Sequence, residues 1–349
     1  MTTVRALGLV AAGAAAVSIG VSAAPAQAAT SYVALGDSYS SGTGTRSYIA
    51  DGTSCQRSTL AYPSLIAASK GLSLNFRACS GATVADVTNT QLSALSSSTT
   101  HVTLSVGGND AGFADVLTEC AMPGWASNCN GAIDAAQSFV NNVLPGRLST
   151  LYSSIRTKAP NAKVVIVGYP RIFMGEDCNA LTWFSPAEET RLNAMADLLN
   201  SKTSSAASAK GFSFANPTSR FIGHAVCDDV EWLNGLSSPV SESYHPNRPG
   251  HSGGYAPTVS TPLTGSAFRL TSATSQKAAA SADRLAAQQR TYAVRDASIT
   301  PKEFRAPDLS TAEVKAAAAR AGVDLRSRAS IDRADRIWSD HQAAQVAGR

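Results

Sequence analysis

Four residues of the chain have types that together suit acyl transfer: Ser38, Gly81, Asn109 and His245. A serine hydroxyl is a weak nucleophile until a neighbouring histidine accepts its proton, so Ser38 and His245 form a candidate pair. Attack on a carbonyl creates an oxyanion that needs fixed hydrogen-bond donors. The backbone amides of Ser38 and Gly81 and the carboxamide of Asn109 supply three such donors. The set therefore predicts nucleophilic attack on an ester-like carbonyl carbon.

The elements that must position these residues alternate between strand and helix. Short apolar or β-branched runs, each bounded by Gly, Ser, Pro or Cys, predict strands. A capping box that begins at Ser185, with Pro186 at the first helical position, predicts a helix to about residue 210. This alternation predicts an α/β protein: a three-layer α/β/α fold with a flavodoxin-like five-stranded parallel sheet. Ligands of such sheets bind beyond the carboxyl ends of the strands, where Ser38, Gly81 and Asn109 follow. The five predicted strands are 31–35, 73–77, 102–106, 163–167 and 211–214.

The order of these motifs resembles the SGNH (GDSL) hydrolase family. Gly36-Asp37-Ser38, Gly81, Gly107-Gly108-Asn109-Asp110 and His245-Pro246 are similar to its ordered blocks, and 32–42 and 107–113 are similar to the secreted actinobacterial lipase/esterase branch. The resemblance covers about residues 30–260. It implies Ser38 as nucleophile, His245 as base, and Ser38, Gly81 and Asn109 as the oxyanion hole. It also implies that no metal or organic cofactor is needed.

The group that orients His245 is left open by the sequence. The family usually has an aspartate three residues before its histidine, and this chain has Glu242 there. Glu242 is one candidate, because a longer carboxylate can still reach the imidazole Nδ1. The backbone carbonyl near Ser243 is the other, which would make the catalyst a Ser–His dyad. We favour the carbonyl, since the reach of a glutamate from a tight loop is uncertain.

The N-terminus and the cysteines predict secretion. Residues 1–28 read as a signal peptide, with Arg5 before a small apolar stretch and Ala26-Gln27-Ala28 as the cleavage site. The alternative is a membrane anchor. The chain has six cysteines, which pair in an oxidising compartment, and no close Cys/His cluster indicates a metal site. Six cysteines allow 15 pairings. The family resemblance implies one of them, Cys55–Cys79, Cys120–Cys129 and Cys178–Cys227.

Composition divides the mature chain into two parts. We predict a hydrolase domain over 29–262 and an Ala/Arg-rich helical extension over 263–349, which holds 14 Lys or Arg and nine Asp or Glu. Capping boxes at Thr300-Pro301-Lys302-Glu303 and Ser310-Thr311-Ala312-Glu313 predict helix starts, and we expect helices over 276–289, 312–321 and 331–347. One hypothesis for the extension is a helical or partly disordered tail docked loosely on the domain. The other is a basic amphipathic surface that contacts lipid membranes.

The predicted function is a secreted serine ester hydrolase that acts on acyl lipids, as a lipase or esterase or as a phospholipase A. One alternative is a carbohydrate O-acetylesterase, and an alternative of another class is a non-catalytic secreted binding protein on a hydrolase scaffold. Of the 349 residues only 15% are charged and the net charge is +4, which argues against a nucleic-acid partner. The expected partner is the acyl-ester lipid, and the protein is expected to be an extracellular monomer.

Overall fold

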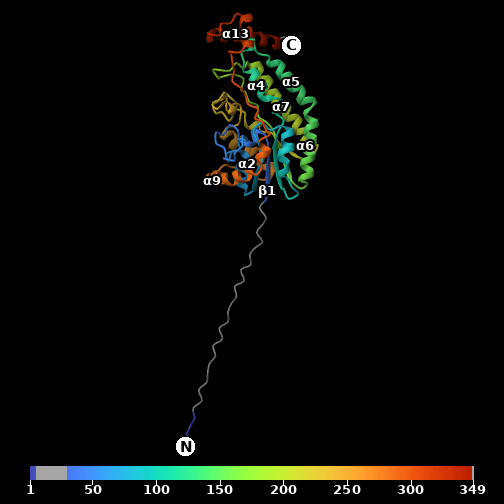
Figure 1. The fold of residues 1–349 in the computed structure, drawn as a ribbon, viewed down its shortest axis with the longest axis vertical. Helices are drawn as coiled ribbons and strands as arrows, with labels where there is room; N and C mark the ends of the chain where they lie inside the picture. The colour runs from blue at the N-terminus through green and yellow to red at the C-terminus, as the bar shows by residue number, and fades with distance from the viewer. Residues whose placement is uncertain (5–29, 348–349) are drawn as a thin grey trace.

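The computed structural model describes residues 1–4 and 30–347. The predicted signal peptide therefore lies outside the described residues except for its first four. Among the helices of the described part, none is long and apolar enough to cross a bilayer. Figure 1 shows an α/β body with the helices of the C-terminal extension along one side and at the end opposite the first strand.

A five-stranded, all-parallel sheet forms the centre of the body, with strand order β2-β1-β3-β4-β5. This is the predicted flavodoxin-like arrangement, and the fold prediction is confirmed. The register pairs Tyr32 with His101 and Val102 with Val164, so the strands end near one another at the carboxyl edge. The strands are β1 Ser31–Gly36, β2 Ser73–Phe76, β3 His101–Ser105, β4 Lys163–Val167 and β5 Ser213–Ala215.

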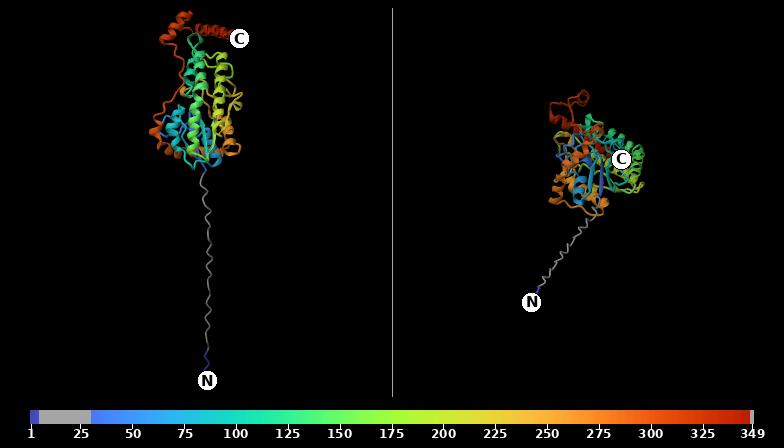
Figure 2. Two further views of the ribbon diagram at one scale, coloured as in Figure 1. Left: turned by 90° about the vertical axis from the view of Figure 1, so that its right-hand side faces the viewer. Right: turned by 60° about the horizontal axis from the view of Figure 1, so that its bottom comes forward.

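Helices cover both faces of the sheet, since the strands are buried nearly throughout and a parallel sheet must be shielded on both sides. Helices α2 and α8 pack on one face and α6 and α7 on the other (Figures 1 and 2). Ser185 caps α7 as predicted, through the bond that its side chain accepts from the Glu188 amide. The helices of this part are α1 Ser38–Ser41, α2 Tyr62–Lys70, α3 Val84–Asp86, α4 Phe113–Cys120, α5 Cys129–Asn142, α6 Leu144–Lys158, α7 Pro186–Ser208 and α8 Ala256–Thr264.

The C-terminal extension packs firmly against the hydrolase body. The predicted boundary at residue 262 falls inside α8, because Pro262 is accommodated within that helix and Leu263 is fully buried. Of the two hypotheses for the extension, loose docking does not fit, since Leu285, Phe304 and Ile331 are nearly completely buried. The helices of the extension are α9 Ser272–Ala280, α10 Ala282–Arg290, α11 Ala293–Asp296, α12 Ala312–Ala321 and α13 Arg328–Ala347.

One of the helix starts predicted in the extension is absent from the structure. No helix follows Thr300, and residues 300–308 run without regular structure because their contacts with the hydrolase body replace the local capping pattern. The predicted helix over 312–321 is confirmed as α12, and its N-cap is Thr311, the second residue of the predicted capping box, which accepts a hydrogen bond from the Val314 amide.

Three disulfides join the six cysteines in the sequential order that the resemblance implies: Cys55–Cys79, Cys120–Cys129 and Cys178–Cys227. The first is important for the site, because it fixes the loop after β2 to the loop after α1. Gly81 lies in the loop after β2, two residues beyond Cys79.

Candidate active site

Ser38 lies at the first position of the short helix α1, directly after β1. Asp37 caps this helix by accepting from the Tyr39 amide at 3.1 Å. The same carboxylate accepts from the Ser105 hydroxyl at 2.7 Å and from the Tyr169 hydroxyl, and burial raises its pKa to about 6. Asp37 thus braces the turn. Its contacts fix the direction in which the Ser38 side chain leaves the sheet.

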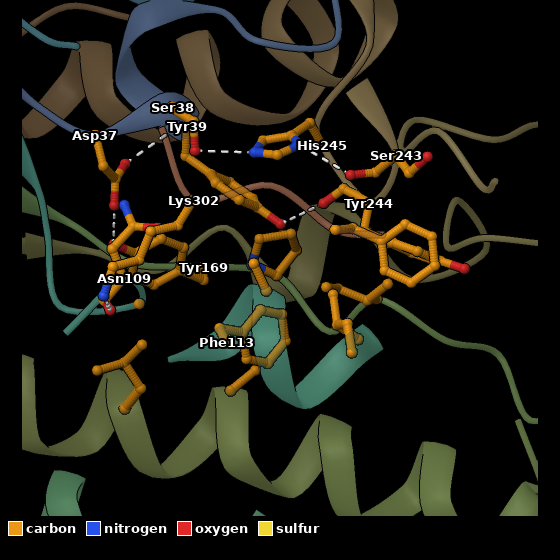
Figure 3. A pocket seen from close by; sticks show the side chains of 18 of the residues that line it. Asp37, Ser38, Tyr39, Asn109, Phe113, Tyr169, Ser243, Tyr244, His245 and Lys302 are labelled. Carbon is orange, nitrogen blue, oxygen red and sulfur yellow. Dashed lines mark hydrogen bonds between the residues drawn. The ribbon is translucent and has the colours of Figure 1, made fainter. Parts of the chain in front are cut away.

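His245 meets Ser38 across the carboxyl edge of the sheet (Figure 3). Its Nε2 lies 2.9 Å from the Ser38 Oγ, and its Nδ1 lies 2.9 Å from the backbone carbonyl of Ser243. With Nδ1 protonated and donating to that carbonyl, Nε2 is free to accept the serine proton. Burial lowers the pKa of His245 to about 4, partly offset by the bond to Ser243, so the imidazole is neutral near pH 7.

Glu242 does not contact the imidazole. Its buried carboxylate accepts a hydrogen bond from the Tyr48 hydroxyl at 2.6 Å, and its other oxygen lies 3.6 Å from the Arg46 Nε. The geometry therefore favours the carbonyl of Ser243 over Glu242 as the group that orients His245. A backbone carbonyl keeps its acceptor character at every pH, which a carboxylate does not.

The expected oxyanion donors come from three different segments. The amide of Ser38 opens a helix, where backbone N–H groups have no intrahelical partner. Asn109 follows β3, and its Nδ2 donates to the Ala82 carbonyl at 3.1 Å, which holds the carboxamide beside the Gly81 loop. Gly81 has a positive φ of 84°, a conformation that favours glycine. Their role as oxyanion donors stays a prediction.

The pocket beside Ser38 and His245 is mainly apolar and encloses a cavity of about 60 Å³. Phe113 contributes to its wall, whereas the aromatic residues Trp125, Trp183 and Phe184 lie elsewhere. The other large apolar residues around the cavity are Leu117, Ile172, Met195, Leu199 and Phe304.

Two pocket residues, Lys302 and Phe304, were missed by the sequence analysis. Both belong to the extension, outside the family resemblance. The capping pattern at residues 300–303 predicts the start of a helix. No local pattern shows that this segment instead runs extended past residues that are distant from it in the sequence.

One cluster of the described residues has metal-type ligand atoms close together, at Cys178, Cys227 and Glu231. The two sulfur atoms are joined in a disulfide, which removes the thiolates that a metal would need. The cluster therefore has a structural explanation.

Comparisons with known proteins show the family of the chain. Residues 34–252 match the family described as GDSL-like Lipase/Acylhydrolase. The chain is 46% identical over 240 residues to Lipase 1 of Streptomyces coelicolor and 44% identical over 238 residues to a lipase of Streptomyces rimosus, in each case 68% of this chain and 88% of the relative. Its fold is similar to that of phospholipase A1 from Streptomyces albidoflavus NA297, with 45% identity and a TM-score of 0.64 over 68% of this chain and all of that structure. About a third of the present chain has no counterpart there.

Proposed function

The chain belongs to the GDSL-like lipase/acylhydrolase family and is a carboxylic ester hydrolase, and on this premise we propose that it hydrolyses acyl lipids outside the cell through Ser38 and His245. The observation that carries the proposal is the pair of 2.9 Å contacts of His245, one to the Ser38 hydroxyl and one to the Ser243 carbonyl. These contacts give the serine a base and give the base a fixed orientation.

In the first step, the Ser38 Oγ attacks the ester carbonyl carbon while His245 Nε2 accepts the hydroxyl proton. The negative charge on the carbonyl oxygen is stabilised by the amides of Ser38 and Gly81 and by the Asn109 carboxamide. The bond to the alcohol then breaks, and the imidazolium of His245 gives its proton to the leaving oxygen. Ser38 is left as an acyl ester.

In the second step, a water molecule attacks the acyl-enzyme. His245 accepts one proton of the water, a second tetrahedral oxyanion forms in the same donor set, and its collapse breaks the bond to Ser38. The proton returns from His245 to the Ser38 oxygen, and a carboxylic acid leaves. The Ser243 carbonyl stabilises the imidazolium in both steps.

An acyl lipid is the substrate class that suits the pocket. Phe113, Leu117 and Ile172 present apolar surface beside Ser38, which matches a hydrocarbon chain. The relatives named above are called lipases, and a related structure of 43% identity is called an extracellular lipase of Streptomyces rimosus. The signal-like sequence of residues 1–28 and the three disulfides support secretion. We propose that the mature protein works as a monomer.

Hydrolysis of a p-nitrophenyl ester series from acetate to palmitate tests the proposal, with the mature protein and its Ser38→Ala variant. We expect turnover of medium or long acyl esters that is lost in Ser38→Ala. Phospholipid vesicles then test phospholipase activity, by release of fatty acid. Activity confined to acetate would overturn the lipid proposal in favour of carbohydrate deacetylation, and absence of turnover in folded protein would favour the binding protein.

A further inference from the structure

Residues 300–305, here called the strap, cross the carboxyl edge of the sheet between α11 and α12. Pro301 lies directly on Gly81, so that a Cβ added to Gly81 would come within 2.5 Å of the Pro301 Cα. Lys302 Nζ donates to the backbone carbonyl of Asn109 at 3.2 Å, and Figure 3 shows Lys302 beside Asn109 at the pocket. The strap therefore packs on the two loops that carry expected oxyanion donors.

Phe304 carries the strap to the histidine side of the pocket. Its side chain is nearly fully buried, and its ring meets the ring of Tyr244 edge-on, with centres 4.9 Å apart. Tyr244 precedes His245 in the chain, and its backbone carbonyl accepts from the Tyr39 hydroxyl at 2.7 Å. Because Phe304 lines the same pocket as Ser38 and His245, the extension supplies part of the wall around the reacting ester.

The strap is anchored on its N-terminal side by a buried ion network. Asp296, at the end of α11, accepts from Arg57 at 2.5 Å and from Arg77 at 2.6 Å, and all three side chains are fully buried. The Arg77 guanidinium also stacks on the Tyr292 ring. Moving Asp296 away would remove a carboxylate that neutralises two buried guanidinium groups, and leaving buried charges without a partner strongly destabilises the folded state.

Further contacts anchor the C-terminal side. The Arg305 amide donates to the Thr118 hydroxyl at 3.0 Å. Beyond the strap, Asp335 in α13 accepts from the Gly124 amide at 2.7 Å, and Asp332 accepts from the Trp183 indole at 3.0 Å. With both ends held, the strap is a fixed part of the site, unlike a lid that opens at low energetic cost.

We propose that Phe304 is a specificity-determining residue that limits the length of the acyl chain the pocket accepts. The inference rests on the ester-hydrolase function proposed above. Phe304 cannot turn out of the pocket without exposing its own ring and that of Tyr244, so a long acyl chain must compete with it for the same apolar space. A smaller side chain at this position frees that space next to Phe113 and Leu117.

The test is the ratio of kcat/KM for p-nitrophenyl decanoate to kcat/KM for p-nitrophenyl acetate, since only the acyl group differs. We expect Phe304→Ala to raise this ratio about tenfold or more, as for other changes of a few methylene groups in an apolar pocket. Phe304→Leu, which perturbs packing less, raises it by a smaller factor. Arg305→Met is the matched control, because its exposed guanidinium faces Asp115 away from the pocket, and its ratio stays at the wild-type value.

Two results would overturn the inference. An unchanged ratio in Phe304→Ala or Phe304→Leu protein that keeps the wild-type melting temperature would remove Phe304 from the acyl pocket. An equal rise in kcat/KM for every ester would make the strap a cover over the whole site instead of a wall of the acyl pocket. Failure of the proposed function is distinguishable from both, because it shows in the protein that keeps Phe304: as activity confined to acetate, as no turnover in folded protein, or as turnover that persists in Ser38→Ala.

Discussion

The imidazole Nδ1 of His245 lies 2.9 Å from the backbone carbonyl of Ser243, two residues earlier in the same loop. The loop can present this carbonyl because Tyr244 adopts a positive φ of 59°, and its amide donates to the Asn234 carbonyl at 2.9 Å. The proposed catalyst is therefore a pair of side chains, Ser38 and His245, supported by the main chain. This relationship leads to the first two predictions.

Replacing Glu242 by Gln should change kcat by no more than a few-fold. The carboxylate contacts Tyr48 and Arg46 instead of His245, and a glutamine oxygen still accepts from the Tyr48 hydroxyl. Steady-state kinetics on p-nitrophenyl butyrate measure the effect. A loss of about 10⁴-fold, as expected when the acidic member of a triad is removed, would identify Glu242 as the orienting group after all.

The acid limb of the pH profile of kcat/KM should lie near pH 4. The free enzyme needs neutral His245, and burial lowers the pKa of this group to about 4, so activity is lost only when pH falls below that value. Burial raises the pKa of Asp37 to about 6, so this carboxyl group titrates in the same pH range. Asp37→Asn is the control, because it removes the titration of Asp37 from the pH profile. A limb near 6.5 that persists in Asp37→Asn would contradict the prediction.

Asn109→Ala should lower kcat by about 10²- to 10³-fold while KM changes little, because an oxyanion donor acts in the transition state. The substitution also removes the bond to the Ala82 carbonyl, so the melting temperature is measured alongside. A rise in KM with kcat preserved would instead assign Asn109 to substrate binding.

Asp296→Asn should reduce the free energy of unfolding by about 3 kcal/mol or more, as for other buried ion pairs that lose one partner. Asp296 is the shared acceptor of the buried Arg57 and Arg77. Chemical denaturation measures the change. Asp324→Asn, at an exposed ion pair with Arg326, is the control and should leave stability unchanged. Equal stability of the two variants would mean that the extension contributes little to folding.

The contribution of Glu188 and Glu189 to stability should fall as pH rises from about 4.5 to 8, and above about pH 6.5 buried His245 and His251 no longer oppose it. Burial raises the pKa of Glu188 to about 7 and of Glu189 to about 8, so the folded protein keeps protons that the unfolded chain releases above about 4.5. Protons bound in excess by the folded state make stability decrease with pH. Glu189→Gln, whose oxygen can still accept from the Gly175 amide, should flatten the dependence of melting temperature on pH. An unchanged slope would contradict the assignment to Glu189.

The sheet and most of the site were predictable because their signals are local. Each strand is a short apolar run with clear boundaries, and the order of strands follows from the rules of parallel sheets. Ser38 and Asn109 each lie within four residues of the end of such a strand. The predicted bounds of β4 are confirmed, and those of the other four strands differ from the structure by one or two residues, as at β5, where the turn after α7 extends to Phe212.

By itself, the sequence determined the fold class, the four residues expected to react or stabilise charge, and the chemistry that their types permit. Only the tertiary structure decided that Ser243 and not Glu242 faces His245, since this depends on the torsion angles of one loop and on the partners of a buried carboxylate. It also decided that Phe304 reaches the pocket, 266 residues after Ser38. A contact over that separation is fixed by the packing of whole helices and by the buried charge of Asp296, which no short sequence pattern encodes.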